Sequence, residues 1–130
     1  MSKSQRVAIV VDDMFFAAKI RAAADVAGRQ LQRIKSREQL GELAADPPEL
    51  VIVDLNSDRI SPIEAIRFLK ESPALAPTPV VGFVSHVQTD LIREAQTAGC
   101  DFVLPRSAFT QMLAEIVAGN LEHIRQRTQS

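Results

Sequence analysis

Short runs of apolar residues alternate along the chain with segments in which apolar residues recur every three or four positions. Apolar runs of strand length cover residues 7–11, 50–53 and 80–84, and a last short strand is predicted at 101–104. Runs that are apolar on both faces are typical of strands buried in a parallel sheet. Residues 30–34 instead alternate apolar and polar side chains, which predicts a half-exposed strand at the edge of the sheet.

Between the predicted strands, residues that favour helix ends stand at the boundaries of the helical patterns. Ser36 and Ser61 are each followed three positions later by Gln or Glu, a pairing typical of helix N-termini. Gly28 and Gly99 stand where two helical patterns end, which predicts C-terminal caps. Ser107 is the predicted N-cap of one long final helix. Its apolar stripe is formed by Leu113, Ile116, Val117, Leu121 and Ile124.

Five strands that alternate with five helices predict a single α/β domain. This order favours a parallel sheet whose right-handed crossovers place helices on both faces. The length of 130 residues fits one domain over residues 1–130, with a core at about 6–124.

Composition and charge exclude several classes of protein. Fifteen Lys and Arg residues against 16 Asp and Glu give a net charge of −1, so binding to nucleic acid or to a membrane is not expected. The single cysteine excludes an intrachain disulfide and a zinc site built from several thiolates. The longest apolar run near the N-terminus is too short for a signal peptide or a membrane span, so we expect a cytoplasmic protein.

Polar residues follow the carboxyl ends of the predicted strands, where open parallel sheets form their sites. The residues at these ends are Asp12, Asp13, Asp54, Ser85, Pro105 and Arg106. Three carboxylates close together repel one another, so a divalent cation that prefers oxygen ligands, Mg²⁺ or Mn²⁺, is the expected balancing charge. Of the adjacent Phe15 and Phe16, one is expected to enter the core and the other to face this acidic edge or a partner.

Three segments together resemble the receiver domain of bacterial two-component response regulators. They are residues 9–13 (IVVDD), 51–55 (VIVDL) and 84–85 (VS). The spacings of 41 residues from Asp13 to Asp54 and 31 residues from Asp54 to Ser85 fit that family. The resemblance implies a flavodoxin-like, doubly wound (βα)5 three-layer sandwich, with five parallel strands in the order 2-1-3-4-5.

The resemblance implies a role for each matching residue. Asp54 matches the aspartate that accepts a phosphoryl group from a histidine kinase. Asp12 and Asp13 match the acidic pair that holds Mg²⁺ together with Asp54 and the backbone carbonyl of Asn56. Ser85 matches the hydroxyl residue that bonds a phosphoryl oxygen. In this chemistry Asp54 supplies a nucleophilic oxygen and the metal neutralises charge on the transferred group.

The last predicted strand matches the family at one position and departs from it at another. Phe102 matches an aromatic switch residue. The family places Lys followed by Pro after this strand, whereas this chain has Leu-Pro-Arg-Ser at 104–107. Counting from Gly99 puts Arg106 in the Lys position, and counting from Phe102 puts Pro105 there. Arg106 is a possible substitute for the Lys, although its planar guanidinium differs from a compact ammonium.

The leading hypothesis is a stand-alone receiver, because the chain ends soon after the predicted fifth helix, before any DNA-binding or catalytic output domain. Such a protein is not an enzyme, apart from catalysing its own phosphorylation and dephosphorylation. A histidine kinase or phosphotransfer protein and a downstream protein are its expected partners. The face formed by the fourth helix, the fifth strand and the fifth helix is the expected surface for that partner or for a homodimer.

Two other classes of protein compete with this hypothesis. A pseudo-receiver would keep the fold as a phosphorylation-independent protein-interaction module, and the missing Lys favours it. A nucleotide- or flavin-binding enzyme would need a Gly-rich or Ser/Thr-rich phosphate loop after the first strand, where this chain has DDMFF at 12–16. That acidic loop repels phosphate unless a cation intervenes, so the enzyme is the least favoured of the three.

Overall fold

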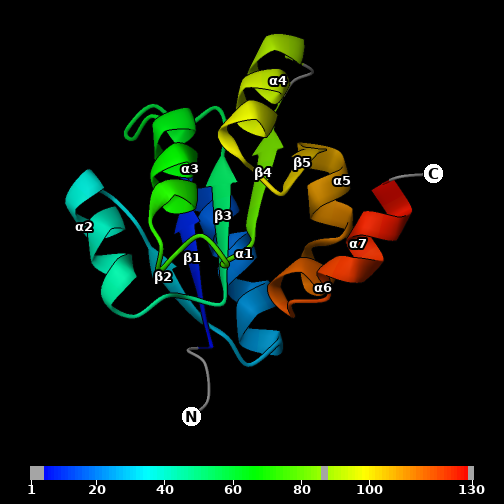
Figure 1. Cartoon of the computed structure of the whole chain (residues 1–130). Coiled ribbons are helices and arrows are strands. Elements are labelled where there is room, and N and C mark those ends of the chain that lie inside the picture. Colours follow the sequence, from blue (N-terminus) through cyan, green and yellow to red (C-terminus); the bar gives the residue numbers. More distant parts are fainter. Residues whose placement is uncertain (1–4, 86–87, 129–130) are drawn as a thin grey trace.

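The computed structural model describes residues 5–85 and 88–128 of the chain, and side chains as far as residue 125. Its centre is a five-stranded parallel sheet in the order β2-β1-β3-β4-β5, which confirms the predicted fold class (Figure 1). The strands are β1 (Arg6–Val10), β2 (Gln30–Arg33), β3 (Leu50–Asp54), β4 (Val80–Val84) and β5 (Phe102–Pro105). The half-polar β2 lies at an edge, as its alternating pattern predicts.

Helices cover both faces of the sheet and make it the middle of three layers. They are α1 (Met14–Val26), α2 (Arg37–Glu42) with a 3₁₀ turn η1 (Leu43–Ala45), α3 (Pro62–Glu71), α4 (Thr89–Ala98), α5 (Arg106–Gln111), α6 (Leu113–Val117) and α7 (Leu121–Thr128). Figure 1 shows α2 and α3 on one side of the sheet and α6 and α7 on the other. In the described part of the chain, none of these helices has the length and apolar character needed to cross a membrane.

The two faces of the sheet bury two separate cores because successive strand residues point to opposite sides. Val7 and Ile9 of β1 pack with α1, α5, α6 and α7, whereas Ala8 and Val10 pack with α2, α3 and α4. All four of these strand residues are at most 1% exposed. Apart from Arg6, which begins β1, the side chains of the central strands β1, β3 and β4 are apolar until the strands end.

Several predicted helix boundaries are confirmed by their caps. The hydroxyls of Ser36 and Ser61 accept hydrogen bonds from the third amide after each of them. Gly28 and Gly99 have positive φ values of 74° and 108°, as C-terminal caps require. At Gly99 a Cβ would also lie 2.9 Å from Cγ of Lys70, so the turn between α4 and β5 needs glycine for space as well as for conformation.

The predicted single long final helix is wrong, because the chain forms α5, α6 and α7 in its place. The first break is at Met112, whose φ of −103° and ψ of 10° leave the helical region. The second is at Gly119, whose φ of 83° ends α6. The predicted N-cap Ser107 is also wrong, since α5 begins at Arg106 after Pro105. The predicted apolar stripe still faces the core, because all three helices pack on the same face of the sheet.

Candidate functional site

The carboxyl ends of β1 and β3 bring three predicted site residues, Asp12, Asp13 and Asp54, to one edge of the sheet. Val10 is the register partner of Val53, so Asp54 ends β3 beside the turn that carries the other two carboxylates. We call this the carboxyl edge and define it by Asp12, Asp13, Asp54, Ser85 and Arg106. Because like charges converge here, they alter one another's pKa values, as the pKa of Asp54 shows.

Asp54 is the most deeply placed of the three carboxylates. Burial is the main cause that raises its pKa above the usual value, and the negative charges of Asp12 and Asp13 add to the rise. The amide N–H of Asn56, which donates to its Oδ1 at 2.9 Å, and the nearby guanidinium of Arg106 oppose the rise without cancelling it. The ionised form of Asp54 is therefore costly here, and a further cation would favour it.

Asp12 holds the loop that follows β3. Its Oδ2 accepts hydrogen bonds from the amides of Asp58 at 2.9 Å and Arg59 at 3.1 Å. Partial burial raises the pKa of Asp12, but these two bonds, the nearby Ser57 hydroxyl and the charge of Arg59 outweigh it and bring the pKa below its usual value. Asp12 is thus ionised and ties the end of β1 to the loop after Asp54.

Asp13 divides its two oxygens between two partners. Its Oδ1 caps α1 by accepting from the amides of Phe15 at 2.9 Å and Phe16 at 3.2 Å. Its Oδ2 lies 3.3 Å from a guanidinium nitrogen of Arg106. The bond from the Phe16 amide is the largest cause that lowers its pKa, and Arg106 lowers it further. The capping role was missed from sequence, although Asp directly before a helical pattern is a known signal for it.

Asn56 connects the loop after β3 to the end of β4. Its side-chain oxygen accepts a hydrogen bond from the amide of Ser85 at 2.8 Å, and its side-chain nitrogen donates to Gln88 at 2.6 Å. From sequence only its backbone carbonyl was singled out. The structure therefore places Ser85 next to the Asp54 loop through a side chain that the sequence did not identify. His86, which follows Ser85, lies outside the described residues.

Arg106, and not Pro105, reaches into the carboxyl edge. Pro105 is the exposed last residue of β5 and pairs in register with Val84. The guanidinium carbon of Arg106 lies 4.2 Å from the centre of the Phe16 ring, in addition to its contact with Asp13. The structure thus settles which residue of this segment contacts the acidic pair.

The two adjacent phenylalanines of α1 take opposite positions, as expected. Phe16 is 4% exposed and lies against Phe83 and Phe109 in the core, with ring centres 4.9 Å and 5.8 Å away. Phe15 is 89% exposed at the start of α1, next to Asp13. One ring therefore supports Arg106 and the other is available at the surface beside the carboxyl edge.

A second arginine, Arg33 at the end of β2, holds the acidic turn by its backbone. It donates from Nε to the carbonyl of Val11 at 3.1 Å and from Nη2 to the carbonyl of Asp12 at 3.0 Å. These bonds cross about twenty residues of sequence, and no local motif indicates them. Arg33 fixes the position of the loop that carries the carboxylates.

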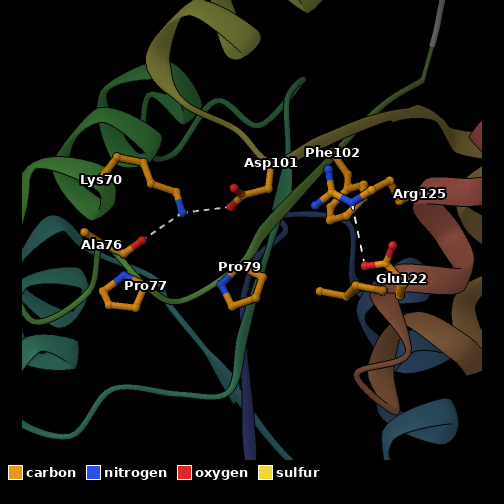
Figure 2. Close-up of a pocket in the computed structure, with 9 residues that line it drawn as sticks. Lys70, Ala76, Pro77, Pro79, Asp101, Phe102, Glu122 and Arg125 are labelled. Atoms are coloured by element: carbon orange, nitrogen blue, oxygen red, sulfur yellow. Dashed lines mark hydrogen bonds and ion pairs between the residues drawn. The ribbon is translucent and has the colours of Figure 1, made fainter. Parts of the chain in front are cut away.

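Phe102 lies away from the carboxyl edge. Its register partner is Val81, four residues before Ser85, and its ring is 8% exposed in the core. The guanidinium carbon of Arg125 lies 5.1 Å from the ring centre (Figure 2). The structure thus gives Phe102 a packing position in the core, at the start of β5.

An open pocket of about 240 Å³ lies at the opposite, amino edge of the sheet, where β4 and β5 begin. Figure 2 shows Lys70 and Asp101 directed toward one another across it. The lining residues are Lys70, Ala76, Pro77, Pro79, Asp101, Phe102, Leu121, Glu122 and Arg125. Because its charged groups pair with one another, this pocket lacks the unbalanced carboxylates that distinguish the carboxyl edge.

The donor atoms at the carboxyl edge fit a magnesium ion in kind. In the parts of the chain that the structure describes, no three Asp, Glu, His or Cys side chains lie close enough to enclose a metal ion. Mg²⁺ does not need such a cage, since it is usually held by one or two carboxylates and several waters. Asp54, whose charge is disfavoured mainly by burial, and Asp13 supply two such carboxylates.

Comparison with known proteins finds the same fold among solved structures of low sequence identity. No protein-family model matches the chain, and no curated protein matches its sequence. Among solved structures, the phosphorylated cyanobacterial phytochrome response regulator RcpA has a TM-score of 0.73 at 20% identity and covers 93% of each chain. The Vibrio cholerae chemotaxis protein CheY4 has a TM-score of 0.75 at 15% identity, over 89% of this chain and 97% of its own.

A third similar structure is the Mn²⁺-bound form of the response regulator Rcp1. It has a TM-score of 0.66 at 20% identity and covers 89% of this chain and 91% of its own. At these identities the likeness establishes that the chain has the fold of response regulator receiver domains.

Proposed function

We propose that the chain is a receiver that accepts a phosphoryl group on Asp54 from a histidine kinase or a phosphotransfer protein. The observation that carries the proposal is the half-buried Asp54 carboxylate at the carboxyl edge, beside two further carboxylates and one guanidinium. The protein shares the fold of RcpA, which was solved in a phosphorylated form.

The proposed reaction is a displacement at phosphorus. An oxygen of Asp54 forms the new P–O bond, the P–N bond of the donor phosphohistidine breaks, and the imidazole leaves with the electron pair. A bound Mg²⁺ would neutralise charge on the transferred group. Asp54 Oδ1 accepts a hydrogen bond from the Asn56 amide, so Oδ2 is the oxygen expected to attack the phosphorus atom. The Ser85 hydroxyl and the Arg106 guanidinium are the donors available to the phosphoryl oxygens.

The chain signals, in this proposal, by binding a downstream protein through α4, β5 and α5. The end of β4 leads into this surface at Ser85, and β5 leads into it at Arg106, so both donors stand at its entrance. A phosphoryl group that contacts both would favour one arrangement of these two segments over another. No enzymatic activity beyond the turnover of this phosphoryl group is proposed.

A second candidate function is the pseudo-receiver, a protein-interaction module that does not depend on phosphorylation. The observation that favours it is the contact of Arg106 with Asp13, because one internal cation already offsets part of the acidic charge. The two candidates share the fold and differ in whether Asp54 reacts.

Intact-mass measurement after incubation with acetyl phosphate and Mg²⁺ separates the two candidates. The receiver gains the mass of one phosphoryl group, and Asp54→Asn abolishes the gain while preserving the shape of the side chain. Asp58→Asn is the matched control, because this exposed carboxylate lies in the same loop. The hydrogen bond from the backbone N–H of residue 58 to Asp12 is kept in this variant. A wild-type protein that stays unmodified, or an Asp54→Asn variant that still gains the mass, contradicts the proposal.

A further inference from the structure

Arg106 occupies an oxygen that a metal ion at the carboxyl edge would need. Asp13 Oδ1 is engaged by the first two amides of α1, at 2.9 Å and 3.2 Å. Its other oxygen, Oδ2, is the one that Arg106 contacts at 3.3 Å. A metal ion that binds Asp13 without breaking the helix cap must therefore approach through Oδ2 and meet the guanidinium there.

The guanidinium is held in this position by an aromatic ring. It lies 4.2 Å over Phe16, which is fixed by two further phenylalanines in the core. A planar guanidinium stacks on such a ring while it contacts a carboxylate, which a compact ammonium does less well. The side chain of Arg106 is nevertheless 38% exposed, so it has room to leave toward solvent.

Two cations at one carboxylate oxygen exclude each other. A divalent ion and a guanidinium within a few ångströms repel, and each would remove the favourable interaction of the other with Asp13. Of the other nearby arginines, Arg33 contacts backbone carbonyls. The charge of Arg59 acts on Asp12 and not on Asp13. The competition at Asp13 is therefore specific to Arg106.

We infer that Arg106 is a built-in counter-cation that competes with a divalent metal ion for Asp13, so that metal binds only when the guanidinium swings away from the Phe16 ring. This inference rests on the proposed function, whose metal site it regulates. In such a site, loading of the metal and withdrawal of Arg106 are a single event, and the freed guanidinium becomes available to another anion.

Titration of the protein with Mn²⁺, followed by the electron paramagnetic resonance signal of the free ion, measures this competition without any phosphoryl transfer. Arg106→Gln is expected to bind Mn²⁺ about three- to ten-fold more tightly than the wild type, because the competing charge is gone. Arg21→Gln, an exposed position on α1, removes the same charge elsewhere and is expected to leave the affinity unchanged. Asp13→Asn is expected to weaken binding in either background.

Arg106→Lys keeps the charge but loses the stacking on Phe16, so its affinity is expected between those of the wild type and Arg106→Gln. It also provides a result should Arg106→Gln fail to fold. Equal affinities in wild type, Arg106→Gln and Arg106→Lys, with binding still dependent on Asp13, overturn the inference and leave the proposed function standing. No Asp13-dependent binding in any of these proteins overturns the metal site of the proposed function as well.

Discussion

Charged side chains are arranged differently at the two edges of the sheet. At the amino edge half-buried cations each meet a carboxylate, as in the pairs of Arg29 with Glu49 and of Lys70 with Asp101, both at 2.7 Å. At the carboxyl edge three carboxylates converge. Within the described residues, only one of them, Asp13, has a cation inside ion-pair distance, and that distance is 3.3 Å.

The charges of the amino edge hold loops in place. Lys70 donates to the carbonyls of Ala76 at 3.2 Å and Thr78 at 2.9 Å in addition to its ion pair. Asp101 also accepts from the amide of Val80 at 2.8 Å, where β4 begins. Every one of these groups is satisfied by the fold. At the carboxyl edge, burial and, to a smaller extent, the charges of Asp12 and Asp13 raise the pKa of Asp54, so the ionised form of Asp54 works against the folded state.

The comparison predicts that the amino edge loses stability when its charges are removed, and Lys70→Met is expected to show the largest loss. The variant keeps most of the side-chain volume but removes three partners of an ammonium that is only 18% exposed. We expect the free energy of unfolding to fall by about 2–3 kcal/mol. Because the chain has no Trp or Tyr, urea unfolding is followed by far-UV circular dichroism.

Lys19→Met is the control for this prediction, since Lys19 is exposed on α1. Its effect is expected to stay within about 0.5 kcal/mol. A loss for Lys70→Met no larger than that of the control would show that the amino-edge network is no more stabilising than an ordinary surface charge.

Glu49→Gln is expected to cost less, about 1–2 kcal/mol, because it removes the charge of a single ion pair with Arg29 and keeps the volume of the side chain. Arg29 is 18% exposed and also donates to the carbonyl of Ala118 at 3.0 Å, so it does not reorient freely. Glu94→Gln, on the exposed face of α4, serves as the matched change. If the two variants unfold at the same urea concentration, the pair contributes nothing measurable.

Much of the fold was predictable because apolar strands and helix caps are local signals. The runs at 50–53 and 80–84 became the buried β3 and β4, and Gly99 ended α4 as predicted. The breaks in the final helix were not predicted, because the apolar stripe continues across Gly119 when α6 and α7 pack on the same face. The stripe reports which side is buried, and it does not report whether the backbone is continuous.

The position of the candidate site was predictable from the residues at the strand ends, but the contacts within the site were not. Asp12, Asp13 and Asp54 lie together because parallel strands end at one edge. The bonds from Arg33 to the acidic turn and from Ser85 to the Asn56 side chain join residues more than twenty positions apart. Such contacts depend on where side chains point in the folded protein, which the periodicity of apolar residues does not predict. For the same reason the sequence did not decide whether Pro105 or Arg106 reaches the carboxyl edge.

The smallest expected effect has the opposite sign and lies at the carboxyl edge. Asp54→Asn is expected to raise the free energy of unfolding at pH 7, by less than the two losses above, because it removes a charge that burial and two neighbouring carboxylates disfavour. Asn retains the oxygen that accepts from the Asn56 amide, so that hydrogen bond is kept.

The pH dependence identifies the charge as the cause. The pKa of Asp54 is higher in the folded state than its ordinary value of 3.8, so the folded state favours the protonated carboxyl. The contribution of the protonated carboxyl to the free energy of unfolding is therefore complete below pH 3.8 and is lost as the pH rises through the folded pKa. The advantage of Asp54→Asn should therefore be full at pH 7 and vanish below pH 3.8. Asp101→Asn is the matched change at the amino edge, and at pH 7 it is expected to destabilise, since Lys70 then loses its counter-ion. If both variants lose stability at pH 7, the contrast between the two edges is wrong, because the carboxylates of the carboxyl edge would then stabilise the fold like those of the amino edge.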